Sequence, residues 1–313
     1  MGQDRSGGGP APTLGVIEGL VLRPGARDVA PLAVPVLGSL AGLGRRLLAA
    51  RTADGARLGL VTGAYMAWAD PPAAETDGPV GVAVLAKLCE ALGVPATVIT
   101  DDPCADVVRA CLDHVQARAE LRAVPASATP EEVHRAGGGW GCTHLLAVER
   151  LGPAADGRVY TMRGLDNTAV TAPLHVLFTQ PGVATAGIGD GGNEIGMGVL
   201  PVDLVAGSIP KGEAIACTVP VDHLIVAGTS NWGCYGLAAT LAVLDPTCAP
   251  AVAALVDPKL DAGLIQAATA VGAVDGVQGE AQPSVDGVSL GAYAPLLNAL
   301  RSIILVEVSR GRS

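Results

Sequence analysis

The segment Val183-Ala-Thr-Ala-Gly-Ile-Gly-Asp-Gly-Gly-Asn-Glu194 joins a short apolar run to a glycine-rich acidic loop. Six of the twelve residues at positions 187–198 are glycine. Glycine adopts positive φ angles without strain and lets the backbone approach a ligand closely. A loop at the carboxyl end of a parallel strand needs these properties. The segment therefore predicts a strand at residues 183–188 that ends in a ligand-binding loop.

Short apolar runs bounded by turn residues alternate along the chain with longer stretches rich in alanine and leucine. This alternation is typical of strands and crossover helices in a mainly parallel sheet. The other predicted strands are residues 58–62, 96–100, 121–124, 144–149, 223–227 and 303–308. The predicted helices are residues 30–50, 79–92, 103–118, 130–136, 233–244 and 259–271. We expect an α/β fold, a mainly parallel sheet with helices on both faces in a three-layer, Rossmann-like arrangement.

Two predicted helices carry start signals. Asp102 and Thr129 each precede a proline at the expected first helical position, so each is predicted to cap its helix. Residues 1–12, rich in Gly, Ser and Pro, are expected to be a disordered tail, and residues 13–313 a single α/β domain. Residues 275–289 predict a long loop. Such loops are often functional, and a mobile connector is the alternative.

The composition excludes several classes of partner. A net charge of -10 and only eight aromatic residues argue against nucleic acid as a partner, because cationic and stacking surfaces would be scarce. No stretch of about 18 apolar residues is free of Gly, Pro and charge, so no membrane span is expected. The N-terminus lacks a basic region followed by an apolar run. We therefore expect a cytoplasmic protein.

The loop after the strand at 183–188 supplies three oxygen-bearing side chains, those of Asp190, Asn193 and Glu194. They suit a hard metal ion or a substrate amine, and the backbone of Gly191 and Gly192 is expected to contact the substrate. The spacing G-x-G-x-x-G also occurs here, but carboxylates would then lie beside a dinucleotide pyrophosphate, which disfavours that interpretation. A turn that merely exposes two acids to solvent is the remaining alternative.

Two further acidic positions are expected near this loop. Glu75 and Asp77 precede the predicted helix at 79–92, and either could bind a metal. When Asp77 is considered by itself, capping of that helix is the better explanation of its position. Thr62 and Gly63 end a predicted strand and are expected to face the same crevice as substrate contacts.

A third group of charged residues follows the strand at 144–149. Glu149 closes this strand and is a candidate metal ligand, whereas Arg150 or Arg163 could bind a substrate carboxylate through two hydrogen bonds. An internal ion pair among these groups is the alternative. Ser230 and Asn231 open a predicted helix, where either capping or substrate contact is expected.

The sequence does not predict sulfur or nitrogen ligands. No pair among the seven cysteines has the C-x-x-C spacing, and none of the five histidines has a zinc-binding spacing. We expect reduced cysteines without a catalytic role. Oxygen ligands favour Mg²⁺ or Mn²⁺ over Zn²⁺ and leave a metal-free site open.

The motifs together resemble the D-glutamate cyclase family. The resemblance rests on residues 189–198 (GDGGNEIGMG), 75–79 (ETDGP), 149–150 (ER), 162–164 (MRG) and 230–233 (SNWG), and it spans about residues 17–308. It implies loss of water from D-glutamate to give 5-oxo-D-proline, with manganese as an associated metal. Asp190 or Glu194 would then move the substrate protons, with Asn193 beside them, and an arginine would hold the α-carboxylate.

Two positions depart from the family pattern. Ala64-Tyr65 stands where the family has phenylalanine after Thr-Gly, and Val80-Gly81 stands where it has Pro-Gly. These departures bear on substrate preference and leave the expected fold unchanged. A metal-dependent hydrolase of phosphate esters or amides, and a non-catalytic metal- or ligand-binding protein, are the alternatives. We expect a small amino acid as the partner, and a homo-oligomer is left open.

Overall fold

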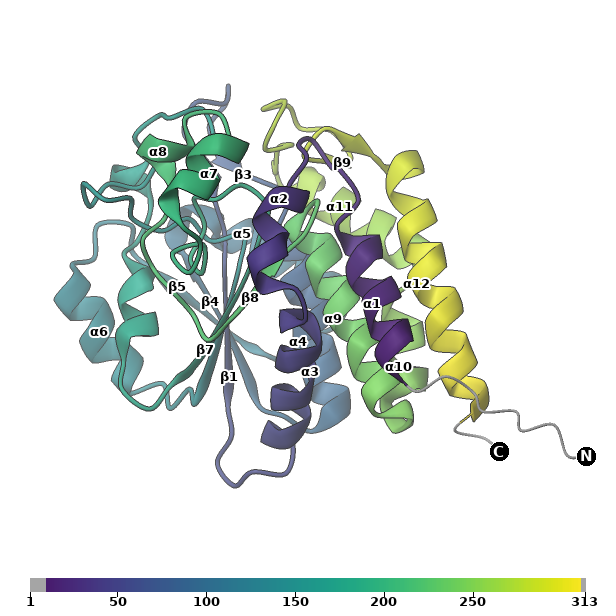
Figure 1. Ribbon diagram of the computed structural model, residues 1–313. Coiled ribbons are helices and arrows are strands. Elements are labelled where there is room, and N and C mark those ends of the chain that lie inside the picture. The colour runs from purple at the N-terminus through teal and green to yellow at the C-terminus, as the bar shows by residue number, and fades with distance from the viewer. Residues whose placement is uncertain (1–9, 311–313) are drawn as a thin grey trace, which may run out of the picture.

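The computed structural model describes residues 10–310, and its centre is a six-stranded parallel sheet (Figure 1). The strands lie in the order β5-β4-β1-β6-β7-β8. Their bounds are β1 (Leu58–Thr62), β4 (Ala96–Asp101), β5 (Glu120–Val124), β6 (His144–Val148), β7 (Ala184–Gly189) and β8 (His223–Val226). The chain runs outward from β1 in one direction and then from β6 in the other, so the topological switch point lies between β1 and β6. Ligands of open α/β sheets bind at the carboxyl ends of the strands flanking such a point.

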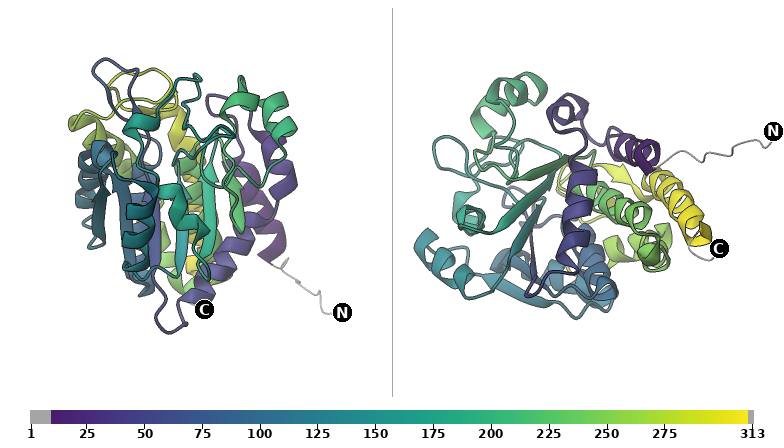
Figure 2. Two further views of the ribbon diagram at one scale, coloured as in Figure 1. Left: turned by 90° about the vertical axis from the view of Figure 1, so that its left-hand side faces the viewer. Right: turned by 60° about the horizontal axis from the view of Figure 1, so that its bottom comes forward.

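Helices cover both faces of the sheet. One face carries α3 (Ser39–Ala50), α4 (Pro79–Leu92), α5 (Ala105–His114) and α9 (Ser230–Leu244), with α1 (Pro10–Val21), α10 (Ala249–Leu255), α11 (Pro258–Ala270) and α12 (Leu290–Arg310) packed on them. The other face carries α2 (Ala30–Ala33), α6 (Pro130–Gly138), α7 (Val202–Ser208), α8 (Gly212–Ile215) and 3-10 turns. Figure 2 shows α1 beside α12. The predicted three-layer α/β fold is confirmed.

The sheet core is built from small and medium side chains. Every residue of β1 and β7 is buried, as parallel strands covered on both faces require. A Cβ atom at Gly59 would lie 2.6 Å from Leu145 and 3.0 Å from Cys142, so the neighbouring strand leaves no space for a side chain there. Such close packing explains how a chain with so few aromatic residues fills its core.

Six of the seven predicted strands are present, and the seventh is wrong. Residues 303–308 form the second half of helix α12. A short run of mostly apolar residues, several of them β-branched, does not by itself distinguish a strand from a buried helix segment. Here the run continues the helix that begins at Leu290, whose buried face contacts α9 and α10.

The predicted helix at 30–50 is divided into α2, the 3-10 turn η1 (Val34–Val36) and α3. Pro35 removes a backbone donor, and Gly38 has a φ of 91°, so neither suits a continuous helix. The predicted tail spans residues 1–12. Residues 1–9 lie outside the described residues, and residues 10–12 begin α1, so the prediction is wrong for residues 10–12.

The two predicted caps have different outcomes. Thr129 forms a reciprocal capping box with Glu132 at the start of α6, which confirms the prediction. Asp102 instead lies in the 3-10 turn η2 (Asp102–Cys104) and accepts a hydrogen bond from the Ala126 amide. Its side chain therefore ties two loops together and caps no helix.

The long segment at 275–289 is ordered around Asp275. This buried carboxylate accepts hydrogen bonds from the amides of Val277 and Gln278 with one oxygen and from Ser284 and Gly287 with the other. The segment ends in a small antiparallel hairpin, β9 (Ser284–Val285) and β10 (Val288–Ser289). The loop therefore has a defined hydrogen-bonded conformation in this structure.

Helix α12 is long and apolar enough to cross a membrane, by length and composition alone. Over Leu290–Ser309 its mean hydropathy reaches 1.2, and 33% of that window is buried within the structure. Two bent helix pairs, residues 30–36 with 39–50 and 230–244 with 246–255, pass the same test together. The expectation that the chain does not contact a membrane stays a prediction.

Candidate active site

Polar residues gather at the carboxyl ends of β1, β6, β7 and β8. Six carboxylates are buried there, each at most 7% exposed. They form what we call the acidic centre: Glu75, Asp77, Glu149, Asp190, Glu194 and Asp286. The centre lies beside the topological switch point, where the fold predicts a ligand site.

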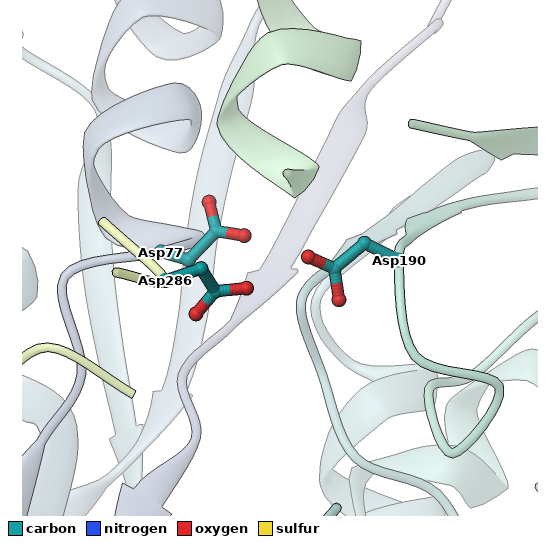
Figure 3. Close-up of side chains that lie close together, drawn as sticks. All are labelled: Asp77, Asp190 and Asp286. Atoms are coloured by element: carbon teal, nitrogen blue, oxygen red, sulfur yellow. The ribbon is translucent and has the colours of Figure 1, made fainter. Parts of the chain in front are cut away.

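The acidic centre contains two groups of three carboxylates that share Asp190. In one group Asp77, Asp190 and Asp286 offer oxygens that all lie within 4.8 Å of one another, and Figure 3 shows their carboxylates turned toward a common space. In the other group Glu149 and Glu194 stand with Asp190 at the same spacing. Either group has the geometry to share a cation.

One cationic side chain, that of Arg27, forms ion pairs with the acidic centre among residues 10–310. Its Nη1 lies 2.6 Å from Asp190 Oδ1, and its Nη2 lies 3.8 Å from Asp286 Oδ2. Burial alone would lower the pKa of the guanidinium, but the surrounding carboxylates, Asp190 first, raise it well above its ordinary value. Arg27 is therefore permanently charged, and one cation faces six acids.

Four carboxylates of the centre, those of Glu75, Asp77, Glu149 and Asp190, hold protons more tightly than acids in water. Burial, followed by repulsion from neighbouring acids, raises the pKa of Glu75 and of Glu149 well above the usual range. Burial also raises the pKa of Asp190, against the opposing effect of Arg27. For Asp77 burial and Asp286 raise the pKa to about 8, despite three backbone hydrogen bonds that lower it. Perturbed groups of this kind are typical of functional sites.

Asp77 and Asn231 cap each other's helices. Asp77 accepts hydrogen bonds from the Ser230 and Asn231 amides at the start of α9. Asn231 Oδ1 accepts hydrogen bonds from Gly78 and Gly81 at the start of α4. The predicted capping of α4 by Asp77 is therefore wrong, because its carboxylate serves α9. The N-cap residue of α9 is Thr229, and neither Ser230 nor Asn231 has that role.

Hydrogen bonds also hold the carboxylates of Glu149 and Glu194 in place. Ser230 Oγ donates a hydrogen bond of 2.6 Å to Glu149, and Glu149 has a strained φ of 45°. Glu194 Oε1 accepts hydrogen bonds from the amides of Asp190 and Gly191. Four buried oxygens have no hydrogen-bond partner: Glu75 Oε1, Asp190 Oδ2, Asn193 Oδ1 and Glu194 Oε2. Buried polar atoms without partners are costly, so these oxygens are free to bind a ligand.

A pocket of about 250 Å³ opens beside the acidic centre. Its polar lining includes Arg27, Glu75, Glu149, Asn193 and Asp286, and its wall includes Met66, Trp68, Leu151, Thr161, Met162, Arg163, Gly276 and Val277. The guanidinium of Arg163 lies 3.8 Å from the centre of the Trp68 ring and donates a hydrogen bond to Val277 O. The pocket thus combines acidic groups with two guanidiniums.

Arg150 does not line this pocket. Its fully buried guanidinium pairs with Asp101 at 2.7 Å and donates hydrogen bonds to the carbonyl oxygens of Gly63 and Ala172. Arg150 therefore forms an internal ion pair, but its partner Asp101 lies outside the group of charged residues considered above. We do not assign Arg150 to substrate binding.

The structure separates the predicted site residues into two sets. Glu75, Glu149, Asn193 and Arg163 line the pocket. The others lie behind it or support the strand ends: Thr62, Gly63, Asp77, Asp190, Gly191, Gly192, Glu194, Ser230 and Asn231. The loop at 190–198 opens no helix, since α7 begins only at Val202. The dinucleotide interpretation of its glycines therefore lacks the helix start that would bind a pyrophosphate.

Sequence reasoning missed Arg27 and Asp286. Arg27 lies in the connection between α1 and α2, 163 residues from its partner Asp190. Asp286 lies at the turn of the β9–β10 hairpin with a φ of 51°. The one available signal was the length of the acidic loop at 275–289. No local pattern distinguished Arg27 from the other arginines.

Comparison with protein families identifies the group to which this site belongs. Residues 18–301 match the family described as D-glutamate cyclase-like, C-terminal. The chain belongs to this family. The match contains Arg27 and all six carboxylates of the acidic centre, and it confirms the family predicted from the motifs.

Human mitochondrial D-glutamate cyclase is a relative of this D-glutamate cyclase-like chain. The two are 33% identical over 188 residues, which is 55% of this chain and 30% of the human protein. The chain therefore spans less than a third of that relative's length. The relative's name places it in mitochondria, and the cytoplasmic location expected for this chain stays a prediction.

Proposed function

We propose that this protein is a lyase that removes water from D-glutamate to form 5-oxo-D-proline, with the help of a divalent cation. The observation that carries the proposal is the acidic centre, which holds six buried carboxylates against one arginine and borders a small pocket with a second arginine. Family membership supports the same reaction class.

The acidic centre suits a hard divalent cation. Its donors are all oxygens, and Asp190 Oδ2 and Glu194 Oε2 are buried without hydrogen-bond partners. Oxygen ligands favour Mg²⁺ or Mn²⁺. Asp190 with Asp77 and Asp286 would hold the ion, which leaves Glu149 of the second group available for proton transfer. When bound, the ion would supply Lewis-acid polarisation of the carboxyl group under attack.

The reaction requires proton transfers that the pocket acids can perform. The substrate ammonium must lose two protons as the nitrogen bonds to the γ-carbon, and the departing oxygen must gain two protons to leave as water. Glu149 lines the pocket, and burial raises its pKa, so it is a stronger proton acceptor than an ordinary carboxylate and can return the proton to the departing oxygen. Asp190 and Glu194, predicted from sequence for this role, lie behind the pocket. We therefore assign proton transfer to Glu149.

The second arginine fits the other end of the substrate. Arg163 is held over Trp68 and by Val277 O, so its guanidinium is oriented before a ligand arrives. A fixed guanidinium binds a carboxylate well. We propose that Arg163 binds the α-carboxylate, with Asn193 Oδ1 accepting a hydrogen bond from the amine.

The test is incubation of the purified protein with D- or L-glutamate, with and without Mn²⁺, followed by chiral detection of 5-oxoproline. We expect 5-oxo-D-proline from D-glutamate, with a higher rate when Mn²⁺ is present. Absence of product at high protein concentration would overturn the proposal. Release of phosphate from a panel of phosphate esters would instead favour the hydrolase alternative, and tight ligand binding without turnover would favour a binding protein.

A further inference from the structure

Arg27 occupies the position that a cation in the first group of carboxylates would need. Its guanidinium contacts two of the three members of that group, Asp190 and Asp286. The third member, Asp77, carries hydrogen bonds from the start of α9. The group is more than an acidic cluster, because Asp190 Oδ2 is buried without a partner.

A divalent cation shared by Asp77, Asp190 and Asp286 would lie close to the Arg27 guanidinium. A bound Mg²⁺ lies about 2.0–2.1 Å from its oxygen ligands, and Arg27 already lies 2.6 Å from Asp190 Oδ1 and 3.8 Å from Asp286 Oδ2. Repulsion between the two cations is strong at a buried site. Binding of the ion should therefore release Arg27.

The side chain can leave while its backbone stays in place. A Cβ atom at Gly25 would lie 2.0 Å from Gly228 O, and the Gly228 amide donates a hydrogen bond to Val21 O. This close packing fixes the backbone that leads to Arg27. The Arg27 side chain is 19% exposed and lines the pocket, so rotation of its side chain toward the pocket meets open space.

We infer that Arg27 is an exchangeable cation: it neutralises the acidic centre before the metal binds, and the metal displaces it into the pocket, where it binds a substrate carboxylate. The inference rests on the proposed metal-assisted function. With Arg163 it would place two guanidiniums in one pocket, which suits a dicarboxylate such as glutamate. Metal and substrate would then strengthen each other's binding, as linkage requires.

The test measures Mn²⁺ affinity by calorimetry at pH 8 for the wild type, Arg27→Met and Arg27→Lys. Arg27→Met should bind Mn²⁺ about tenfold more tightly, because no cation must leave, whereas Arg27→Lys should stay near the wild type. Arg163→Gln is the matched control, since Arg163 lines the same pocket without an ion pair to the aspartates, and its Mn²⁺ affinity should not change. Equal or weaker Mn²⁺ binding by Arg27→Met would overturn the inference.

The second arm measures D-glutamate affinity with and without Mn²⁺. In the wild type Mn²⁺ should tighten D-glutamate binding, and in Arg27→Met this coupling should become weaker, because only the direct contact between ion and substrate remains. Coupling of undiminished strength in Arg27→Met, or a wild type that binds no D-glutamate with Mn²⁺ present, would contradict the carboxylate-binding role. Coupled binding without formation of 5-oxoproline would count against the cyclase reaction and would leave the role of Arg27 supported.

Discussion

Two arginine–aspartate pairs lie near the carboxyl edge of the sheet, and they differ in the balance of positive and negative charge around them. Arg150 and Asp101 form one pair, and the guanidinium also meets two carbonyl oxygens. Arg27 and Asp190 form the other, where one guanidinium faces six carboxylates. The first pair is matched in charge and closed to solvent. The second has excess negative charge and borders a pocket.

The difference indicates that the Arg150–Asp101 pair stabilises the fold, whereas the Arg27–Asp190 pair belongs to the functional site. A matched buried pair is destabilised when either partner is removed. A group of like charges costs stability as it stands, and proteins retain such groups where a ligand or a reaction uses them. Removal of a charge should therefore harm folding at Arg150 and harm activity at Asp190.

The largest effect is expected at the matched pair. Arg150→Met leaves Asp101 buried without its partner and should lower the free energy of unfolding by about 3–5 kcal/mol, measured by urea denaturation. The double variant Arg150→Met/Asp101→Leu removes both charges and should be more stable than Arg150→Met. A loss below about 1 kcal/mol in Arg150→Met would show that the pair is dispensable.

Neutralising a carboxylate of the acidic centre should reduce turnover and leave stability nearly unchanged. Asp190→Asn should reduce turnover of D-glutamate by about 10²–10⁴-fold, with a urea midpoint close to the wild type because one like charge has been removed. Glu149→Gln should also lose turnover, since it removes the proposed proton carrier. Near-normal rates in both variants would contradict the proposed site.

Metal binding should stabilise the protein through the acidic centre. At a Mn²⁺ concentration of 100 times the dissociation constant, mass action predicts a gain of about 2.7 kcal/mol, seen as a rise in melting temperature that EDTA reverses. Asp190→Asn should lose this rise, because both groups of carboxylates contain Asp190. An equal rise in Asp190→Asn would place the metal elsewhere.

The smallest expected effect is on the pH dependence of stability, through Asp261, a buried acid outside both pairs. Asp261 accepts a hydrogen bond from Tyr235, and burial raises its pKa to about 7. Because the folded state binds this proton more tightly, stability from Asp261 should fall as pH rises from about 4 to 7. Asp261→Asn should reduce this decline by at least about 1.4 kcal/mol, the equivalent of one pKa unit. Identical pH profiles from urea unfolding would contradict the buried-acid account.

Much of this architecture could be predicted from local patterns. The strand at 183–188 and its glycine loop, and the acids at positions 75, 77, 149, 190 and 194, all lie at strand ends or helix starts, where parallel topology brings them together. The strand at 303–308 was wrong because a short apolar run carries no period that separates strand from helix.

The partners of these acids could not be predicted, because they come from distant segments without a motif. Arg27 meets Asp190 across 163 residues, and Asp101 meets Arg150 from another strand. Asp77 caps α9 in preference to the helix beside it. Which charge pairs with which depends on the packing of the fold, and that pairing decides whether an arginine supports the structure or lies at the site.

The most direct test of the central claim, that the unbalanced acidic centre binds a divalent cation, is Mn²⁺ binding by calorimetry to the wild type, Asp190→Asn and Asp261→Asn. Each variant differs from the wild type by one buried aspartate. We predict saturable binding in the wild type and in Asp261→Asn, and its loss in Asp190→Asn. No binding to the wild type, or equal binding by all three, would contradict the claim.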